Sequence, residues 1–360
     1  MSFKKTDNSK RLKICVNRIK NTRINFFEKL VTPKKLIAQY PISYRGNSLV
    51  LDTRHAVEQI IAKKDSRMIF IVGPCSIHDV EEAKIYAQEL KEIADIVADK
   101  ILIIMRVYFE KPRTTIGWKG LINDPDLDNT FDVNKGLSMA RKLLNDINNL
   151  GLPCGYEVLD TITPQYISDL ISWGAIGART TESQVHRQLV SGLSMPIGFK
   201  NGTSGDIKIA ADAIVSASYP HSFMGITDMG QAAICKTMGH HHCHIILRGG
   251  TNGPNFEEKH IKVATKILQN ISGKSAIMID CSHGNSMKIH SNQPGVLTDV
   301  IKQRISGNTD IIGVMLESNI NEGKQKLTKG VALKKGVSIT DSCLDIKKTR
   351  EIILSAYEML

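Results

Sequence analysis

The chain has 360 residues, 42% of them hydrophobic and 23% charged, and 47 lysines and arginines against 36 acidic residues give a net charge of +11. This composition is typical of a globular protein with one large domain or two ordinary ones, and no apolar stretch approaches the ~20 residues that span a bilayer. Seven cysteines without Cys-x-x-Cys pairs indicate reduced thiols in a cytoplasmic protein rather than a disulfide framework.

The first 30 residues form a basic arm whose only acidic residues are Asp7 and Glu28. This composition predicts an arm that docks on a neighbouring subunit, and a targeting peptide is the alternative. Thr32 and Pro33 then predict the start of a short helix, because proline is favoured in the first helical turn.

Apolar residues at helical spacing predict a further helix over residues 52–62. We therefore expect residues 1–66 to form a basic arm with a helical extension. The catalytic part of the chain is expected to occupy residues 67–360.

From residue 68 onward, short apolar runs alternate with helical patterns, such as those over 80–96 and 135–150. The predicted strands are 68–72, 101–105, one ending at Glu157, 175–178, 195–199, 245–247, 276–279 and 311–316. Buried parallel strands have continuous apolar runs of this kind. Eight of them alternating with helices predict an α/β fold, a (β/α)₈ TIM barrel.

A ninth strand pattern, 223–226, is followed by a turn over 227–230 and another apolar segment, 232–235. Two short runs joined by a turn are typical of a β-hairpin, not of a strand–helix unit. We therefore predict an inserted hairpin at about 221–238 that leaves eight strands for the barrel.

Several predicted strands end on, or just before, a residue that can bind a metal ion. Cys75, His283, Glu317 and Asp341 occupy such positions. A thiolate, an imidazole and two carboxylates form a plausible set of ligands for a divalent metal. For Cys75 alone, the alternative is a packed core cysteine, because free cysteines are often buried.

Other predicted strands end on cations, namely Arg106, Arg179, Lys200 and Arg248, and the stretch 111–115 reads KPRTT. Arginine and lysine match phosphate oxygens, and this number of cations exceeds what one phosphate requires. Two small phosphorylated substrates explain them better than a nucleic acid, because aromatics are only 5%. A Schiff base on Lys200 is an alternative use of that residue.

The run from His240 to His244 contains four histidines and Cys243. Consecutive histidines cannot all bind one ion, and no second pair at zinc-finger spacing lies nearby. We expect this run to form a polar surface turn.

Several of these segments resemble the type I DAHP synthases, which condense phosphoenolpyruvate with erythrose 4-phosphate in the first committed step of aromatic amino acid synthesis. The similarity extends from about residue 30 to 355. The motifs that carry it are 73–79, 111–115, 117–121, 177–183, 198–203, 247–250, 280–285 and 338–341.

The resemblance implies a role for each site residue. It assigns one divalent ion, Mn, Fe, Co or Zn, to Cys75, His283, Glu317 and Asp341. It assigns phosphoenolpyruvate to Arg106, Arg179, Lys200 and Arg248, and erythrose 4-phosphate to Lys111, Arg113 and Thr114. Lys111 is expected close to both substrates, and Glu157 to handle water or a proton. A homodimer or homotetramer is expected, with no nucleic acid or membrane partner.

The resemblance also implies a pocket for an inhibitory aromatic amino acid. Its residues would be Asn21, Ile24, Pro164, Gln165, Gly192, Leu193, Ser194, Phe223 and Gly225. Phenylalanine-sensitive relatives carry serine in place of Gly225, so glycine leaves room for a hydroxyl on the effector ring, and Asn21 offers a polar partner. Residues 191–198 and 312–319 are most similar to tyrosine-sensitive members, and we expect inhibition by tyrosine.

Two other functions remain as alternatives. A sister enzyme condenses phosphoenolpyruvate with arabinose 5-phosphate, but the KPRTT stretch and the chain length favour the four-carbon sugar. A basic nucleic-acid-binding protein on a barrel scaffold would bind in a strongly salt-dependent manner. The intact set of residues at the strand ends argues against it.

Overall fold

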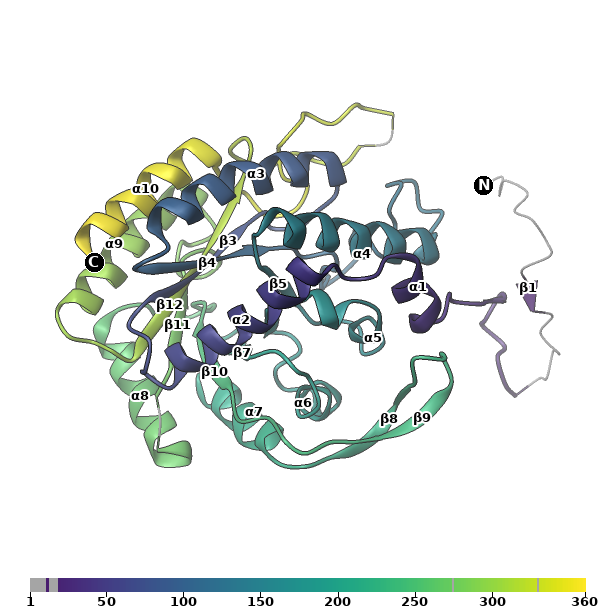
Figure 1. Ribbon diagram of the computed structural model, residues 1–360, viewed down its shortest axis with the longest axis horizontal. Coiled ribbons are helices and arrows are strands. Elements are labelled where there is room, and N and C mark those ends of the chain that lie inside the picture. Colours follow the sequence, from purple (N-terminus) through teal and green to yellow (C-terminus); the bar gives the residue numbers. More distant parts are fainter. Residues whose placement is uncertain (1–10, 13–18, 274, 329) are drawn as a thin grey trace.

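The computed structural model describes residues 11–12, 19–273, 275–328 and 330–360, and eight parallel strands within them form a closed barrel (Figure 1). The barrel strands are β3 (Met68–Gly73), β4 (Ile101–Arg106), β5 (Cys154–Glu157), β6 (Trp173–Ile176), β7 (Ile197–Lys200), β10 (Cys243–Leu247), β11 (Ile277–Asp280) and β12 (Ile311–Asn319). Each strand pairs with the next in this order, and β12 also pairs with β3 and so closes the ring. The predicted (β/α)₈ fold is confirmed.

The strands are apolar along most of their length, up to the charged residues at their carboxyl ends, because both of their faces are covered. All six residues of β3 are buried. Its side chains alternate, so that Ile69 and Ile71 belong to the cluster inside the barrel, whereas Phe70 and Val72 pack with the outer helices. This is why the strands appear in the sequence as continuous apolar runs.

Helices cover the outside of the barrel (Figure 1). They are α3 (Val80–Val97), α4 (Val133–Leu150), α5 (Pro164–Ile167), α6 (Gln184–Val190), α7 (Lys208–Ser218), α8 (Glu258–Ser272), α9 (Gln293–Ile305) and α10 (Ile346–Met359). Two 3₁₀ turns, η2 (Ser168–Leu170) and η3 (His290–Asn292), and a short strand, β13 (Leu344–Asp345), complete this part. Asp79 caps α3 by accepting hydrogen bonds from the backbone of Glu81 and Glu82.

Two helices precede the barrel, α1 (Pro33–Gln39) and α2 (Tyr44–Ile61). Thr32 caps α1, as the sequence predicts, but α2 begins earlier than the predicted residue 52. Ser43 starts this helix by accepting a hydrogen bond from Gly46 N at 3.0 Å. The first turn of α2 has no apolar pattern in the sequence because its side chains face solvent. Tyr44, for example, is 90% exposed.

The last turns of α2 close one end of the barrel. Val57, Ile60 and Ile61 belong to the same buried cluster as side chains that point into the barrel. Lys63, just after the helix, forms an ion pair with Asp310, which directly precedes β12. Because α2 lies at the amino ends of the strands, the carboxyl ends remain accessible.

The two peripheral β elements lie apart from the barrel. In the arm, β1 (Arg11–Leu12) pairs with β2 (Phe27–Glu28), and residues 1–10 and 13–18 lie outside the described part of the chain. Between α7 and β10, β8 (Ser222–Ile226) and β9 (Ala232–Lys236) form an antiparallel hairpin where the insertion was expected (Figure 1). The division of the chain at residue 66 stays a prediction.

The prediction of a polar surface turn is wrong for two residues of the histidine run, whereas His241 and His242 are exposed in the loop that enters β10. His240 and His244 are only 7% and 1% exposed. His240 Nε2 lies 2.9 Å from the carbonyl of Met195, and Trp173 Nε1 donates to His244 Nε2 at 2.9 Å inside the barrel. Burial lowers the pKa of both imidazoles to about 4, so they are neutral packing residues.

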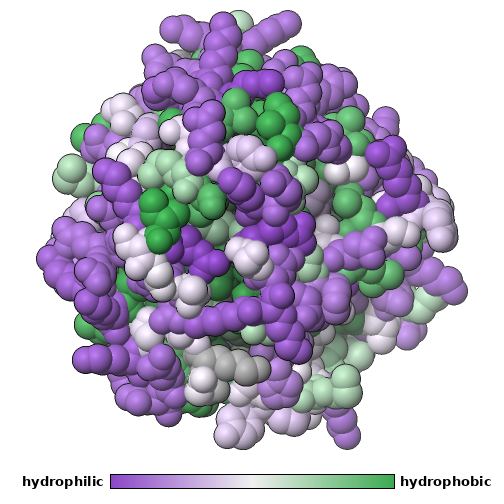
Figure 2. All heavy atoms as spheres, turned by 60° about the vertical axis from the view of Figure 1, so that its left-hand side comes forward, coloured by the Kyte–Doolittle hydropathy of each residue, from purple (hydrophilic) through white to green (hydrophobic). Residues whose placement is uncertain are grey.

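No described helix is long and apolar enough to cross a membrane. The face that carries α8, α9 and α10 is mostly hydrophilic, with small scattered apolar patches (Figure 2).

Two glycine substitutions test how tightly the barrel is closed. A Cβ at Gly313 in β12 would lie 2.2 Å from the carbonyl oxygen of Ile69 in β3, whereas a Cβ at Gly295 in α9 would meet nothing within 4 Å. Gly313→Ala should therefore reduce the free energy of unfolding by roughly 1–3 kcal/mol or more. Gly295→Ala should raise it by about 0.5–1 kcal/mol, because alanine is the better helix former. Urea unfolding followed by fluorescence measures both, and wild-type stability of Gly313→Ala would contradict this packing.

Candidate active site

Charged residues converge at the carboxyl ends of the barrel strands. Arg106, Glu157 and Lys200 are the last residues of β4, β5 and β7, and Glu317 lies near the end of β12. Cys75 follows β3 by two residues. Because all eight strands are parallel, these side chains share one rim of the barrel, which is where (β/α)₈ enzymes carry their active sites.

Three of the four predicted metal ligands come together at this rim. The ligand atoms of Cys75, Glu317 and Asp341 all lie within 4.8 Å of one another. Cys75 Sγ is 3.6 Å from Asp341 Oδ2 although 266 positions separate the two residues. His283 lies next to this group, with Nε2 3.7 Å from Glu317 Oε1, but it is not one of the three.

The chemistry of these groups fits a divalent ion. Burial and the charge of Glu317 raise the pKa of the Cys75 thiol to about 11. Burial alone would raise the pKa of Asp341, but Lys111 and His283 outweigh it and lower that pKa, so the carboxyl is ionised. Sulfur, nitrogen and oxygen donors together suit several divalent transition metals, and the thiol would release its proton on binding.

Arg106 is a buried cation, 1% exposed, held in place on several sides. Its Nη2 donates to Glu317 Oε1 at 2.9 Å, and its Nε donates to the carbonyl of Pro74 at 3.1 Å. Its guanidinium also lies 3.7 Å from the centre of the Tyr108 ring, a cation–π contact. The guanidinium therefore has a fixed position beside the candidate metal ligands.

Two lysines continue the line of cations. Lys111 Nζ lies 3.2 Å from both the carbonyl oxygen and the sulfur of Cys75. Lys200 Nζ lies 3.3 Å from Asp280 Oδ2 and 3.7 Å from Glu157 Oε2.

Glu157 is an ionised carboxylate in spite of its burial. Burial alone would raise the pKa of this group, but the charges of Lys200, Lys111 and Arg106 outweigh it and lower the pKa. The loop after β6 passes close by, because a Cβ on Gly177 would lie only 2.4 Å from Glu157 Oε1. This carboxylate can accept a proton and cannot supply one at neutral pH.

Asp280 is a site residue that the sequence analysis missed. It is fully buried, and its Oδ2 lies 2.9 Å from His283 Nδ1 as well as beside Lys200. Burial alone would raise its pKa, but His283 and Lys200 lower that pKa well below the usual range. It ends the apolar run of β11, so the rule that found the other strand-end residues would have found Asp280 too.

The remaining predicted substrate residues lie further out. Arg179 is exposed in the turn after β6, and Arg248 follows β10. Arg113 and Thr114 are exposed in the loop after β4, where Arg113 Nε donates to the carbonyl of Trp118 at 2.9 Å. Among the described residues, no hydrogen bond or ion pair joins Arg113 or Thr114 to the Cys75 group.

A second cavity, of about 580 Å³, lies between the hairpin and the segments around α5 and α6. Seven of the nine predicted regulatory residues line it, namely Pro164, Gln165, Gly192, Leu193, Ser194, Phe223 and Gly225. Asn21 and Ile24 do not line it. The cavity in this chain is thus formed without the arm.

Glu110, which the sequence analysis also missed, joins the two regions. It directly precedes Lys111, is 2% exposed, and accepts hydrogen bonds from the hydroxyls of Tyr156 and Thr163. Thr163 in turn precedes Pro164, which lines the second cavity. Burial raises the pKa of Glu110 to about 7.

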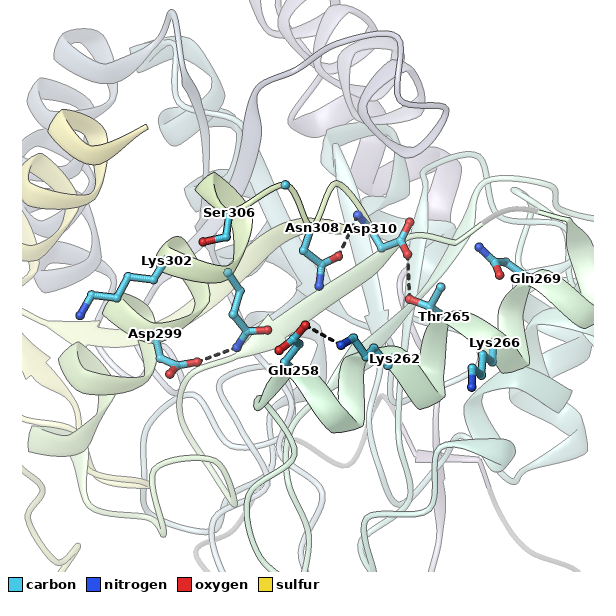
Figure 3. Close-up of a pocket in the computed structure, with 12 residues that line it drawn as sticks. Glu258, Lys262, Thr265, Lys266, Gln269, Asp299, Lys302, Ser306, Asn308 and Asp310 are labelled. Carbon is cyan, nitrogen blue, oxygen red and sulfur yellow. Dashed lines mark hydrogen bonds and ion pairs between the residues drawn. The ribbon is translucent and has the colours of Figure 1, made fainter.

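A groove of about 710 Å³ between α8 and α9 lies away from this rim (Figure 3). Three pairs of its polar side chains bond to each other: Lys262 with Glu258 at 2.7 Å, Gln303 with Asp299 at 2.6 Å, and Thr265 with Asp310 at 2.8 Å. These pairs leave fewer free charges in the groove than at the rim.

Comparison with known proteins agrees with this geometry. The phenylalanine-sensitive phospho-2-dehydro-3-deoxyheptonate aldolase of Escherichia coli K12 is 50% identical over 331 residues, 92% of this chain and 94% of the relative. The tyrosine-inhibited enzyme of Candida albicans is 50% identical over 339 residues, 92% of each chain. The tyrosine-sensitive enzyme of Escherichia coli K12 is 46% identical over 343 residues, 95% of this chain and 96% of the relative.

These identities do not single out either effector class. A solved structure of phospho-2-dehydro-3-deoxyheptonate aldolase from Francisella tularensis SCHU S4 superposes with a TM-score of 0.91 at 50% identity, and the match covers 93% of this chain and 98% of that one. The family model described as the DAHP synthetase I family matches residues 39–354. The chain belongs to the DAHP synthetase I family.

Proposed function

We propose that the protein condenses phosphoenolpyruvate with erythrose 4-phosphate and water to give DAHP and inorganic phosphate, the first step of aromatic amino acid synthesis. The convergence of Cys75, Glu317 and Asp341 with fixed cations at one rim supports this reaction most directly. Membership of the DAHP synthetase I family supports it as well.

The reaction joins two anions that repel each other. The methylene carbon of phosphoenolpyruvate bonds to the aldehyde carbon of the sugar, whose oxygen becomes a hydroxyl. Water adds to the carbon that bears the phosphate, and phosphate leaves from that carbon to give the 2-keto group. We assign phosphoenolpyruvate to Arg106, Arg179, Lys200 and Arg248, and the sugar phosphate to Lys111, Arg113 and Thr114. Fixed cations hold both anions together and require little reorganisation as charge moves.

The metal ligands define what an ion would contribute. A divalent ion held by Cys75, His283, Glu317 and Asp341 supplies Lewis-acid polarisation of the aldehyde carbonyl. Mn, Fe, Co and Zn all accept such a donor set. Because the thiol must stay reduced, and the cysteines of the described residues are free, we place the enzyme in the cytoplasm.

Glu157 is the proposed acceptor for a proton from the attacking water. Its lowered pKa keeps it ionised, and Lys200 holds its carboxylate at the rim. Glu157 is therefore in the deprotonated form that a general base requires.

A coupled assay for released phosphate tests the proposed reaction and its metal together. Wild-type protein should release phosphate from phosphoenolpyruvate when erythrose 4-phosphate is present. A chelator should abolish the release until a divalent ion is restored. Cys75→Ser should lose bound metal and at least about 100-fold in activity, because losing even an outer partner of a ligand costs about 10–100-fold. Cys235→Ser, which alters a cysteine of the hairpin, is the matched control and should keep both.

Two results would reject these assignments. Preferred turnover of arabinose 5-phosphate would move the protein to the sister reaction. Full activity in a Cys75→Ser preparation whose metal content has been quantified would remove Cys75 from the metal site.

The cavity beneath the hairpin is the proposed site for feedback inhibition, and tyrosine is the proposed effector. Gly225 faces this cavity, and a Cβ there would lie 2.7 Å from Cys235 Sγ. We propose that the ring hydroxyl of the effector takes the space on the cavity side of Gly225. A serine at this position would need both that space and a shift of Cys235.

Gly225→Ser should weaken inhibition by tyrosine by about tenfold, since the added hydroxymethyl group occupies the space proposed for the effector hydroxyl. Activity without effector should be unchanged. Steady-state inhibition curves for tyrosine, phenylalanine and tryptophan measure this, with Cys235→Ala as the control for changes at the neighbouring strand. Inhibition of the wild type by phenylalanine but not tyrosine would reject the assignment.

We propose that the protein is a homodimer or homotetramer in which a neighbour's arm packs on the hairpin. The outer face of the hairpin exposes Met224 and Ile234 by 91% and 73%, and Phe27 of the arm is 44% exposed. Burial of such groups between subunits is favourable. Light scattering should give a mass of two or four chains, and a stable monomer would contradict the proposal.

A further inference from the structure

Three buried asparagines connect the loops that follow β7, β10 and β11, which are neighbours in the barrel. Asn201 directly follows β7, Asn255 lies beyond β10, and Asn285 lies beyond β11. They are only 0%, 5% and 3% exposed. A buried amide is retained at low cost only where its donor and acceptor are both satisfied.

All three amides bond to the backbone around Arg248. Arg248 N donates to Asn201 Oδ1 at 2.8 Å, and Asn201 Nδ2 donates to the carbonyl of Gly249 at 3.0 Å. Gly249 N donates to Asn255 Oδ1 at 2.7 Å. Asn285 Nδ2 donates to the carbonyl of Leu247 at 3.0 Å. Arg248 is therefore held at its own peptide group and at both neighbours.

The asparagines also bond to one another, so the three loops form one unit. Asn255 Nδ2 donates to Asn201 Oδ1 at 3.2 Å, and Asn255 N donates to Asn285 Oδ1 at 2.7 Å. Asn285 Nδ2 reaches the carbonyl of Asp280 at 2.9 Å. Each amide thus uses its oxygen as an acceptor and its nitrogen as a donor, which neither a carboxylate nor an apolar side chain can do.

Glycines allow the loops to meet backbone to backbone at this point. A Cβ on Gly249, which has a φ of +69°, would lie 2.5 Å from the carbonyl carbon of Gly284. A Cβ on Gly250 would lie 2.2 Å from the backbone nitrogen of Gly205. No side chain fits between these loops, so the hydrogen bonds of the three asparagines set the distance between them.

We propose that Asn201, Asn255 and Asn285 form a positioning network that presets Arg248 and Lys200 for the phosphoenolpyruvate anion. The proposal rests on the proposed assignment of these two cations to phosphoenolpyruvate. Lys200 is the last residue of β7 and directly precedes Asn201. The Asn201 side chain therefore links the peptide of Arg248 to the end of β7. Cations fixed before the substrate arrives need no rearrangement when it binds.

Asn255→Ala tests the network, because it removes the bonds to Gly249 and to Asn201 without touching either cation. The KM for phosphoenolpyruvate should rise roughly tenfold, the scale of two lost hydrogen bonds. The KM for erythrose 4-phosphate and the bound metal should change less than about twofold, because Asn255 bonds to none of the residues assigned to these two sites. Steady-state kinetics and metal analysis on the same preparation provide these values.

Asn148→Ala is the matched control. Asn148 is also a fully buried amide that donates to two carbonyl groups, those of Leu144 and Leu170, but it lies on α4. Its loss should lower stability and leave the KM for phosphoenolpyruvate unchanged. Two results would overturn the network. One is an equal KM for phosphoenolpyruvate in Asn148→Ala and Asn255→Ala. The other is a parallel rise of the KM values for both substrates in Asn255→Ala, together with loss of metal.

A further variant keeps the test decisive if Asn255→Ala does not fold. Asn255→Asp has nearly the same shape and keeps the acceptor for Gly249, but it loses the donor to Asn201 and should also raise the KM for phosphoenolpyruvate. An unchanged KM in the variant that folds would overturn the proposal. Absence of turnover in the wild type would instead refute the proposed function, so the two failures are distinguishable.

Discussion

The closed ladder of parallel backbone hydrogen bonds is the constraint on which the rest of this molecule depends. Since β12 pairs with both β3 and β11, the first and last barrel strands become neighbours. The register that sets Glu317 opposite Gly73 brings Cys75 to Glu317 and Asp341. Side chains alternate between the two faces of a strand, so a slip of one residue would turn Glu317 towards the outer helices. The position of the site is therefore a result of how the sheet closes.

The rim then carries a dense, balanced set of buried charges. Arg106, Lys200, Asp280 and Glu317 are all no more than 3% exposed. Removing such groups from water costs more than their mutual attraction returns unless the geometry is good. Each cation here has a carboxylate within 4 Å, and the nearby cations lower the pKa of Glu157 and Asp280 and so keep these two groups ionised. Such an arrangement favours the binding of anionic substrates more than it favours the stability of the fold.

The barrel could be predicted from the sequence because buried parallel strands are uniformly apolar and each ends on a distinctive residue. The same rule found Cys75 and Glu317, whereas Asp280 was missed although it obeys the rule. Burial of His240 and His244 could not be predicted, since it depends on partners such as Trp173 and Met195 that are distant in sequence. The asparagine network was missed for the same reason, as isolated amides carry no periodic pattern. The reaction itself came from family resemblance, because the charges alone indicated only two anionic substrates.

The hairpin of β8 and β9 leaves the chain between α7 and β10 and takes no part in the barrel ladder. Residues at its base and tip can therefore change without disturbing a single strand register at the catalytic rim. Relatives named for phenylalanine and for tyrosine, at 50% and 46–50% identity to this chain, fit that independence. Given the proposed role of the hairpin cavity, a lineage can exchange one feedback signal for another, or lose the signal, through substitutions in this peripheral hairpin while selection on turnover stays the same.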